Sequence, residues 1–310
     1  MQKKTYNQPI GKIGTVAIDL PVIELGAGTP IVTISSAIHG DELTGIFILQ
    51  KLVDIITLTK GTLRIIPVLN PLGFAEKKRI NPIDGADLNR SFGVSAAKLR
   101  FSHYIAETMK RFVADSELII DLHVFGVRRS LTTAIQYHGD NETLNQKNLR
   151  YIKMMNPDFI WQENIKTGEI DKTGMLIGYA YDLGKTSFGM EYTIHFDVNE
   201  KEIDRNVSGL VNILNSLAMT EQKFPAPERK IPIIERISQI NDEAGLFIPH
   251  KKLGENIKKG DIVGQLLDPA TLEMKDIAAE KEGVLFSIAD RELMNTAEKM
   301  FTLAKKINEL

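Results

Sequence analysis

The stretch "PIVTISSAIHGDELTGIFILQKLVDII" (residues 30–56) decides the fold class of this 310-residue chain. Residues 30–38 are apolar and rich in β-branched side chains, which is typical of a buried strand in a parallel sheet. Residues 42–56 place apolar side chains at helical spacing and begin with acidic residues, which favour a helix N-terminus. The stretch therefore predicts a strand followed by a helix, with His39 and Glu42 at the junction.

The same alternation continues to about residue 219. The pattern predicts further strands over 61–71, 116–123 and 188–194, and further helices over 96–114 and 202–219. Strands that alternate with helices indicate an α/β domain, with a mixed, largely parallel sheet flanked by helices.

A second region begins after a Pro-rich, charged segment at residues 221–232, where we place a linker. We therefore predict an α/β domain over residues 1–225 and a small all-β domain over residues 226–310. The brief β-like runs of the second domain resemble the hammerhead barrel of lipoyl and biotinyl domains. Lys275 lies only eight residues before Gly283, so we expect a surface lysine there rather than a carrier site.

Composition narrows the function classes. With 38 basic and 40 acidic residues the net charge is −2, which provides no electrostatic footprint for nucleic acid or an anionic membrane. No apolar run approaches the roughly 18 residues that a membrane-spanning helix needs, and no apolar stretch follows the charged N-terminus as a secretory signal would. The chain has no cysteine, which fits the cytoplasm and leaves His, Asp and Glu as metal ligands.

Two histidines and a glutamate are candidate metal ligands. His39 follows one predicted strand and His123 ends another, and ligands bind at the carboxyl ends of strands in open α/β sheets. Glu42 lies one helical turn beyond His39, so we expect that the two side chains can point the same way. Two imidazoles and a carboxylate, with a fourth position open to water, are the ligands of a hydrolytic zinc site. The alternative is a polar loop that binds nothing.

A cluster of basic and amide residues lies between these histidines in sequence. Arg79, Asn89 and Arg90 follow a predicted strand that ends in Asn-Pro. Arginine grips a carboxylate with two parallel hydrogen bonds and stabilises an oxyanion. A solvated basic loop is the alternative for these residues. Arg128 and Arg129, which follow DLHVFG closely, could add positive charge at the pocket, but we expect them in a solvated turn.

Four motifs resemble the succinylglutamate desuccinylase/aspartoacylase family, which is related to the zinc carboxypeptidases. In chain order they are HGDE (39–42), DLNRSF (87–92), DLH (121–123) and MEYT (190–193). The resemblance covers roughly residues 30–200 and implies a zinc-carboxypeptidase-like fold with one zinc ion per chain. A small C-terminal β domain also fits it, since family members often carry one.

The resemblance also implies roles for individual residues. Zinc would be held by His39, Glu42 and His123. Arg79 would polarise the scissile carbonyl, Asn89 with Arg90 would hold a substrate carboxylate, and Glu191 would be the general base. Asp121, two residues before His123 on the same strand, is a candidate acceptor for the second nitrogen of that imidazole. His195 is a candidate proton shuttle. Tyr179, Tyr181 and Tyr192 are the candidates for the tyrosine that assists related carboxypeptidases.

These observations favour a cytoplasmic zinc-dependent deacylase that cleaves the amide bond of an N-acyl amino acid or a similar small carboxylate-bearing amide. One alternative is a metallocarboxypeptidase that cuts peptides, which a roomy, open cleft would favour. Another is a non-catalytic binding protein that keeps the fold. We expect a small-molecule partner, neither nucleic acid nor membrane, and the sequence leaves the oligomeric state open, a homo-oligomer included.

Overall fold

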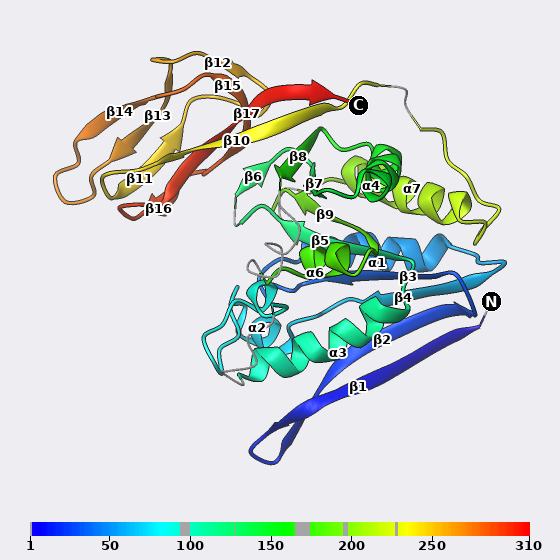
Figure 1. Ribbon diagram of the computed structural model, residues 1–310. Helices are drawn as coiled ribbons and strands as arrows, with labels where there is room; N and C mark the ends of the chain where they lie inside the picture. Colours follow the sequence, from blue (N-terminus) through cyan, green and yellow to red (C-terminus); the bar gives the residue numbers. More distant parts are fainter. Residues whose placement is uncertain (1, 94–99, 127, 165–173, 195–197, 227–228) are drawn as a thin grey trace.

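A mixed 13-stranded sheet runs through the whole molecule (Figure 1). The computed structural model describes residues 2–93, 100–126, 128–164, 174–194, 198–226 and 229–310. Twelve strands follow one another across the sheet in the order β1-β2-β4-β3-β5-β9-β7-β8-β10-β17-β15-β12, and β6 pairs with β15. The strands are β1 (Lys3–Ile13), β2 (Val16–Ala27), β3 (Ile31–Ser36), β4 (Gly61–Ile66), β5 (Leu118–Val124), β6 (Arg129–Ser130), β7 (Thr133–His138), β8 (Phe159–Asn164), β9 (Thr186–Tyr192), β10 (Pro232–Ile240), β12 (Asn256–Ile257), β15 (Gly283–Ile288) and β17 (Lys299–Glu309).

The centre of the sheet is parallel. Strands β4, β3, β5 and β9 are parallel neighbours, as are β7, β8 and β10, whereas β7 and β9 run antiparallel. The strands predicted near residues 30, 61, 116 and 188 are β3, β4, β5 and β9, so the predicted α/β fold is confirmed. Every residue of β4 and β5 is buried, and this explains why most of their residues are apolar.

Helices cover both faces of this central sheet. One apolar core joins the sheet to the helices α1 (Thr44–Ile55), α4 (Glu142–Met155) and α7 (Glu200–Ser216). A second core on the other face includes residues of α3 (Phe101–Asp115) and α6 (Leu176–Asp182). A short helix, α2 (Pro71–Glu76), and a 3₁₀ turn, η1 (Leu88–Arg90), lie in the connection between β4 and α3.

The strands of the C-terminal β region, residues 232–309, belong to two sheets. Its strands β10, β17, β15 and β12 continue the main sheet beyond β8. A second, antiparallel sheet has the order β14-β13-β11-β16 and contains β11 (Gly245–Pro249), β13 (Ile262–Leu267), β14 (Met274–Ala278) and β16 (Glu292–Met294). Side chains of both sheets, such as Phe247 and Leu303, share one apolar core. The predicted boundary at residue 225 stays a prediction.

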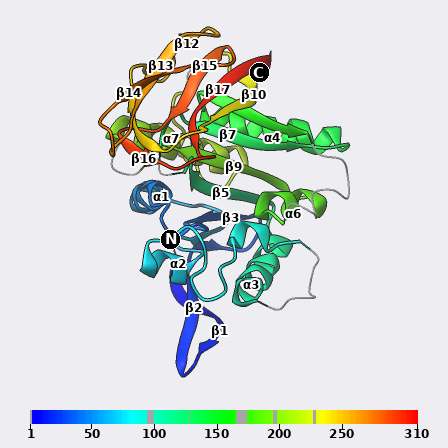
Figure 2. The ribbon, with the colours of Figure 1, turned by 90° about the vertical axis from the view of Figure 1, so that its left-hand side faces the viewer.

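Two further observations concern the surface. Lys275 lies on β14, is exposed and forms an ion pair with Glu243, as expected for a surface lysine. The hairpin of β1 and β2 extends from the end of the molecule opposite the C-terminal β region (Figure 2). Among the described residues, no helix is both long enough and apolar enough to cross a membrane.

Candidate active site

The turn between β3 and α1 places His39 and Glu42. Ala37 adopts a left-handed backbone with φ 49°, and backbone hydrogen bonds from Leu69 and Asn70 to Ser36 and Ala37 hold the chain there. The amide of Glu42 then donates to the carbonyl of His39 at 3.1 Å. Helix α1 begins only at Thr44. The sequence-based expectation of a helical turn between His39 and Glu42 was therefore wrong: a non-helical turn brings their side chains together.

Gly40, the second residue of the HGDE motif, is required by close packing. Its backbone lies against the start of α2, and a Cβ atom at this position would lie 2.0 Å from the carbonyl carbon of Gly73. Its amide donates to the carbonyl of Lys78 at 3.1 Å. Any larger residue would push the turn away from α2, and His39 and Glu42 would move with it.

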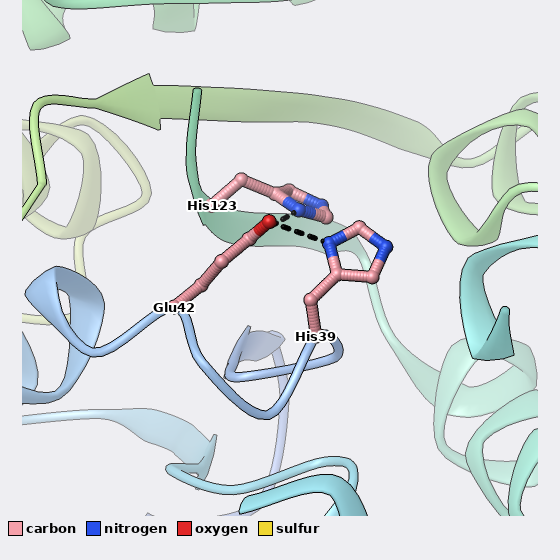
Figure 3. Close-up of side chains that lie close together, drawn as sticks. All are labelled: His39, Glu42 and His123. Atoms are coloured by element: carbon pink, nitrogen blue, oxygen red, sulfur yellow. Dashed lines mark hydrogen bonds and ion pairs between the residues drawn. The ribbon is translucent and has the colours of Figure 1, made fainter. Parts of the chain in front are cut away.

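His123, near the end of β5, completes a buried cluster with His39 and Glu42 (Figure 3). Glu42 Oε1 lies 2.7 Å from His39 Nδ1, and Glu42 Oε2 lies 3.1 Å from His123 Nδ1. One ligand atom from each of the three residues can be chosen so that all lie within 4.8 Å of one another. This cluster could hold a metal ion.

Two aspartates hold the other nitrogens of these imidazoles. His39 Nε2 lies 3.1 Å from Asp87 Oδ1, and His123 Nε2 lies 2.7 Å from Asp121 Oδ2. Asp121 also accepts a hydrogen bond from the Ser35 hydroxyl across the β3–β5 pair. A carboxylate at Nε2 fixes the tautomer in which Nδ1 keeps its lone pair, which is what a metal ligand requires. The donor set thus fits a divalent cation.

The charges in this cluster perturb one another. Burial alone would lower the pKa of His123, but the charge of Asp121 and the contact with Glu42 outweigh it and raise that pKa well above its ordinary value. Burial raises the pKa of Glu42, but the neighbouring imidazoles outweigh this effect. The pKa of Glu42 therefore lies below its ordinary value. Glu42 also accepts hydrogen bonds from the Val124 amide at 3.0 Å and from Arg79 Nη1 at 3.2 Å.

Glu191 lies beside the cluster without joining it. It is the direct neighbour of His123 in the register of the parallel strands β5 and β9. Among the described residues, its buried Oε2 has no hydrogen-bond partner. Burial raises the pKa of Glu191 to about 7, against the attraction of His123. A carboxyl group with a pKa near neutrality is suited to accept and return a proton.

The predicted substrate-binding residues lie in the same pocket. Arg79 contacts Glu42 and, through Nη2, Asp87 Oδ2 at 3.2 Å. Asn89 is buried, and its Oδ1 accepts from the amide of Leu176 at 2.9 Å. Arg90 is exposed and donates to the Asn89 carbonyl at 2.8 Å. Asp87, the first residue of the DLNRSF motif, connects this group to His39, a role that our sequence analysis missed.

The pocket has a volume of about 480 Å³ and extends from the metal-ligand cluster to the C-terminal β region. Its far end is lined by Arg128, by Trp161 and Glu163 on β8, by Arg236 on β10 and by Lys299 at the start of β17. Arg128 is therefore a pocket residue, and its expected place in a solvated turn was wrong. The neighbouring Arg129 forms an exposed ion pair with Asp290.

Of the tyrosines, Tyr137 on β7 lines the pocket, whereas Tyr179, Tyr181 and Tyr192 are not among its lining residues. The Tyr181 hydroxyl contacts the Gly139 amide and Asn145 instead. Side chains alternate between the two faces of a strand, so a strand over residues 133–138 would have predicted Tyr137 on the same face as Ile135. His195 lies outside the described residues.

The comparisons with known proteins agree with this geometry. Residues 28–217 match the succinylglutamate desuccinylase/aspartoacylase catalytic domain. The N-alpha-acetyl-L-2,4-diaminobutyric acid deacetylase of Halomonas elongata is 22% identical over 309 residues, which cover 96% of this chain and 88% of the relative.

Solved structures show the same fold across nearly the whole chain. The product-bound ectoine utilization protein EutE (DoeB) of Ruegeria pomeroyi has a TM-score of 0.83 at 21% identity, covering 98% of this chain and 94% of the other. A succinylglutamate desuccinylase/aspartoacylase of Rhodobacter sphaeroides has a TM-score of 0.82 at 16% identity, covering 98% and 96%. Since the catalytic-domain match spans more than half of the chain, this protein belongs to the succinylglutamate desuccinylase/aspartoacylase family.

Proposed function

We propose that the protein is a zinc-dependent hydrolase that removes the acyl group from an N-acyl amino acid or a similar small amide bearing a carboxylate. The observation that carries this proposal is the convergence of His39 Nδ1 and His123 Nδ1 on Glu42, with the unpartnered carboxyl oxygen of Glu191 on the adjacent strand. A binding protein that only kept the fold would have no need of such a base.

His39, Glu42 and His123 would hold one zinc ion, which supplies a water of lowered pKa and a Lewis acid for the carbonyl oxygen. Glu191 accepts the proton of the attacking water and returns it to the leaving amine. Arg79 offers its guanidinium to the negative charge that develops on the carbonyl oxygen. The Asn89 amide nitrogen and Arg90 hold the substrate carboxylate.

A small substrate is favoured over a peptide. The pocket volume, about 480 Å³, is that of a small-molecule site, and residues of β8, β10 and β17 line it. The Halomonas elongata relative is named for the deacetylation of an acetylated amino acid, which supports the same class of substrate here. We expect the reaction to take place in the cytoplasm, because the chain has no cysteine.

A panel of N-acyl amino acids with zinc-loaded protein tests the proposal, with metal analysis of the same sample. Arg79→Ala should mainly lower kcat, since Arg79 meets charge that develops in the transition state, whereas Arg90→Ala should mainly raise KM. The methyl ester of an accepted substrate should be cleaved poorly. An ester cleaved as well as the free acid would exclude the carboxylate-binding role of Asn89 and Arg90.

A further inference from the structure

Four uncharged side chains of the pocket lining form an apolar patch. The apolar patch consists of Ile135 and Tyr137 on β7 and of Met175 and Ile177 at the start of α6. Tyr137 and Ile177 are buried in a small apolar cluster, against which Ile135 and Met175 pack half-buried. The Tyr137 hydroxyl donates to Met175 Sδ at 2.9 Å, within the patch itself. The patch therefore offers a ligand an apolar surface rather than a charge.

The apolar patch lies beside the proposed general base. Ile135 on β7 is in register with Gly189 on β9, which precedes Glu191 by two residues. Residues two apart on a strand share a face, so Gly189 and Glu191 face the same side of the sheet. A Cβ atom at Gly189 would lie 3.4 Å from Ile177 Cδ1 and 3.7 Å from Ile135 Cβ. The two isoleucines therefore meet over Gly189, about 7 Å along the strand from Glu191.

Close contacts fix the apolar patch relative to the proposed carboxylate site. The Leu176 amide donates to Asn89 Oδ1 at 2.9 Å, and the residues on both sides of Leu176 belong to the patch. Gly174 packs against Arg90, since a Cβ atom at position 174 would lie 2.3 Å from the Arg90 carbonyl oxygen. The side chain of an amino acid begins only two bonds from its carboxylate carbon. A substrate whose carboxylate contacts Asn89 therefore has its side chain next to the patch.

We propose that the apolar patch is a subsite for the side chain of the substrate amino acid and selects aliphatic side chains. This inference rests on the proposed deacylase function and narrows its substrate class to N-acyl derivatives of apolar amino acids. Burial of an aliphatic side chain against the patch is favourable. A polar side chain of the same size would lose hydrogen bonds with water that an apolar surface does not replace.

N-acetyl-L-leucine and N-acetyl-L-asparagine test this selection, because their side chains are similar in size and differ in polarity. We expect kcat/KM to be at least about tenfold higher for the leucine derivative, since burial of a leucine side chain is enough for that ratio. Met175→Gln keeps an acceptor for the Tyr137 hydroxyl and should lower the leucine-to-asparagine ratio about tenfold. Met274→Gln makes the same change at an exposed position of β14, outside the pocket, and should leave the ratio unchanged.

A second pair of substrates distinguishes the amino-acid side chain from the acyl group. N-butanoylglycine and N-acetylglycine differ only in the length of the acyl chain, and neither has a side chain. The ratio of their kcat/KM values should be the same in Met175→Gln as in the parent. If Met175→Gln changes this ratio more than the leucine-to-asparagine ratio, the patch binds the acyl group and the proposal is wrong.

Hydrolysis and binding distinguish failure of the subsite from failure of the deacylase function. Ile135→Thr, with the exposed Ile240→Thr as control, repeats the test at a second position of the patch. If both N-acetyl amino acids are cleaved but their ratio is near one, or neither patch variant changes it, the apolar subsite is wrong and the deacylase proposal stands.

If neither substrate is cleaved, calorimetry with L-leucine and L-asparagine on the zinc-loaded protein still decides. L-leucine should bind about tenfold more tightly, and this preference should be lost in Met175→Gln and kept in Met274→Gln. Equal affinities for the two amino acids in the parent protein would overturn the subsite.

Discussion

The two ends of the pocket differ in how their charged side chains are paired. At the metal-ligand end the charges of the ligand cluster have close partners: Glu42 contacts His39, His123, the Val124 amide and Arg79 at 2.7–3.2 Å. At the other end, Arg128, Arg236 and Lys299 line the wall with no carboxylate within ion-pair distance among the described residues. Both ends are rich in ionisable groups, yet only the ligand cluster at the first end has its charges paired within the chain.

This difference distinguishes charges that are paired within the chain from charges that lie near one another with no carboxylate at ion-pair distance in the part of the chain that the structure describes. A buried charge network destabilises the fold when one member is removed, because the remaining charges lose their partners. A group of like charges gains stability when one member is removed, or when an anion binds. The same kinds of residue should therefore respond in opposite ways to substitution at the two ends.

The largest effect is expected for His123→Ala at the metal-ligand end. Most of the bound metal and nearly all hydrolysis should be lost, and the free energy of unfolding should fall by about 3–5 kcal/mol, because Glu42 and Asp121 would lose a buried partner. Elemental analysis and thermal unfolding measure both, with the exposed His250→Ala as control. Full metal occupancy in His123→Ala would show that our ligand set is wrong.

Glu191→Gln should keep the metal and lose about 10²–10⁴-fold in kcat, since general-base catalysis contributes that much. The substitution preserves the size of the side chain and removes only the ability to accept the proton. Steady-state kinetics on an accepted substrate, with the metal content measured on the same sample, provide the test. A kcat within threefold of the parent would remove Glu191 from the mechanism.

Asp87→Asn should weaken metal binding about 10–100-fold, as is usual when the acceptor behind a ligating histidine is changed. Asp87 contacts both His39 and Arg79, so the loss should be accompanied by a lower kcat. Competition with a chelator gives the affinity, and Asp204→Asn on the exposed face of α7 serves as control. If the metal affinity of Asp87→Asn lies within twofold of that of the parent protein, Asp87 does not support the metal site.

The smallest effect, and the one of opposite sign, is expected at the cationic end. Lys299→Gln should leave the free energy of unfolding within about 0.5 kcal/mol of the parent or raise it, because it removes repulsion and breaks no ion pair. Lys51→Gln removes a lysine that is paired with Asp204 and Glu200, and should lower the melting temperature. If Lys299→Gln is less stable than Lys51→Gln, repulsion among Arg128, Arg236 and Lys299 does not destabilise the fold.

Much of the metal-ligand end could be predicted because its residues lie in short motifs. Strands β3 and β5 begin with apolar, β-branched or aliphatic residues and are buried throughout most of their length. His39 follows β3 and His123 lies near the end of β5, so sheet topology brings the two histidines to one edge. The position of Asp121 follows from strand alternation with His123. The link between Asp87 and His39 was missed, since 48 residues and an irregular segment separate them.

The sequence by itself determined the α/β fold and the three candidate ligands, because local periodicity and motif spacing encode them. Only the tertiary structure decided that His39 and Glu42 meet through a non-helical turn, since Gly40 packs against α2 from a distant part of the chain. It also decided that β10 and β17 extend the main sheet and bring Arg236 and Lys299 to the pocket that holds His39. Pairing between strands so far apart depends on the packing of the whole sheet, and no local pattern records it.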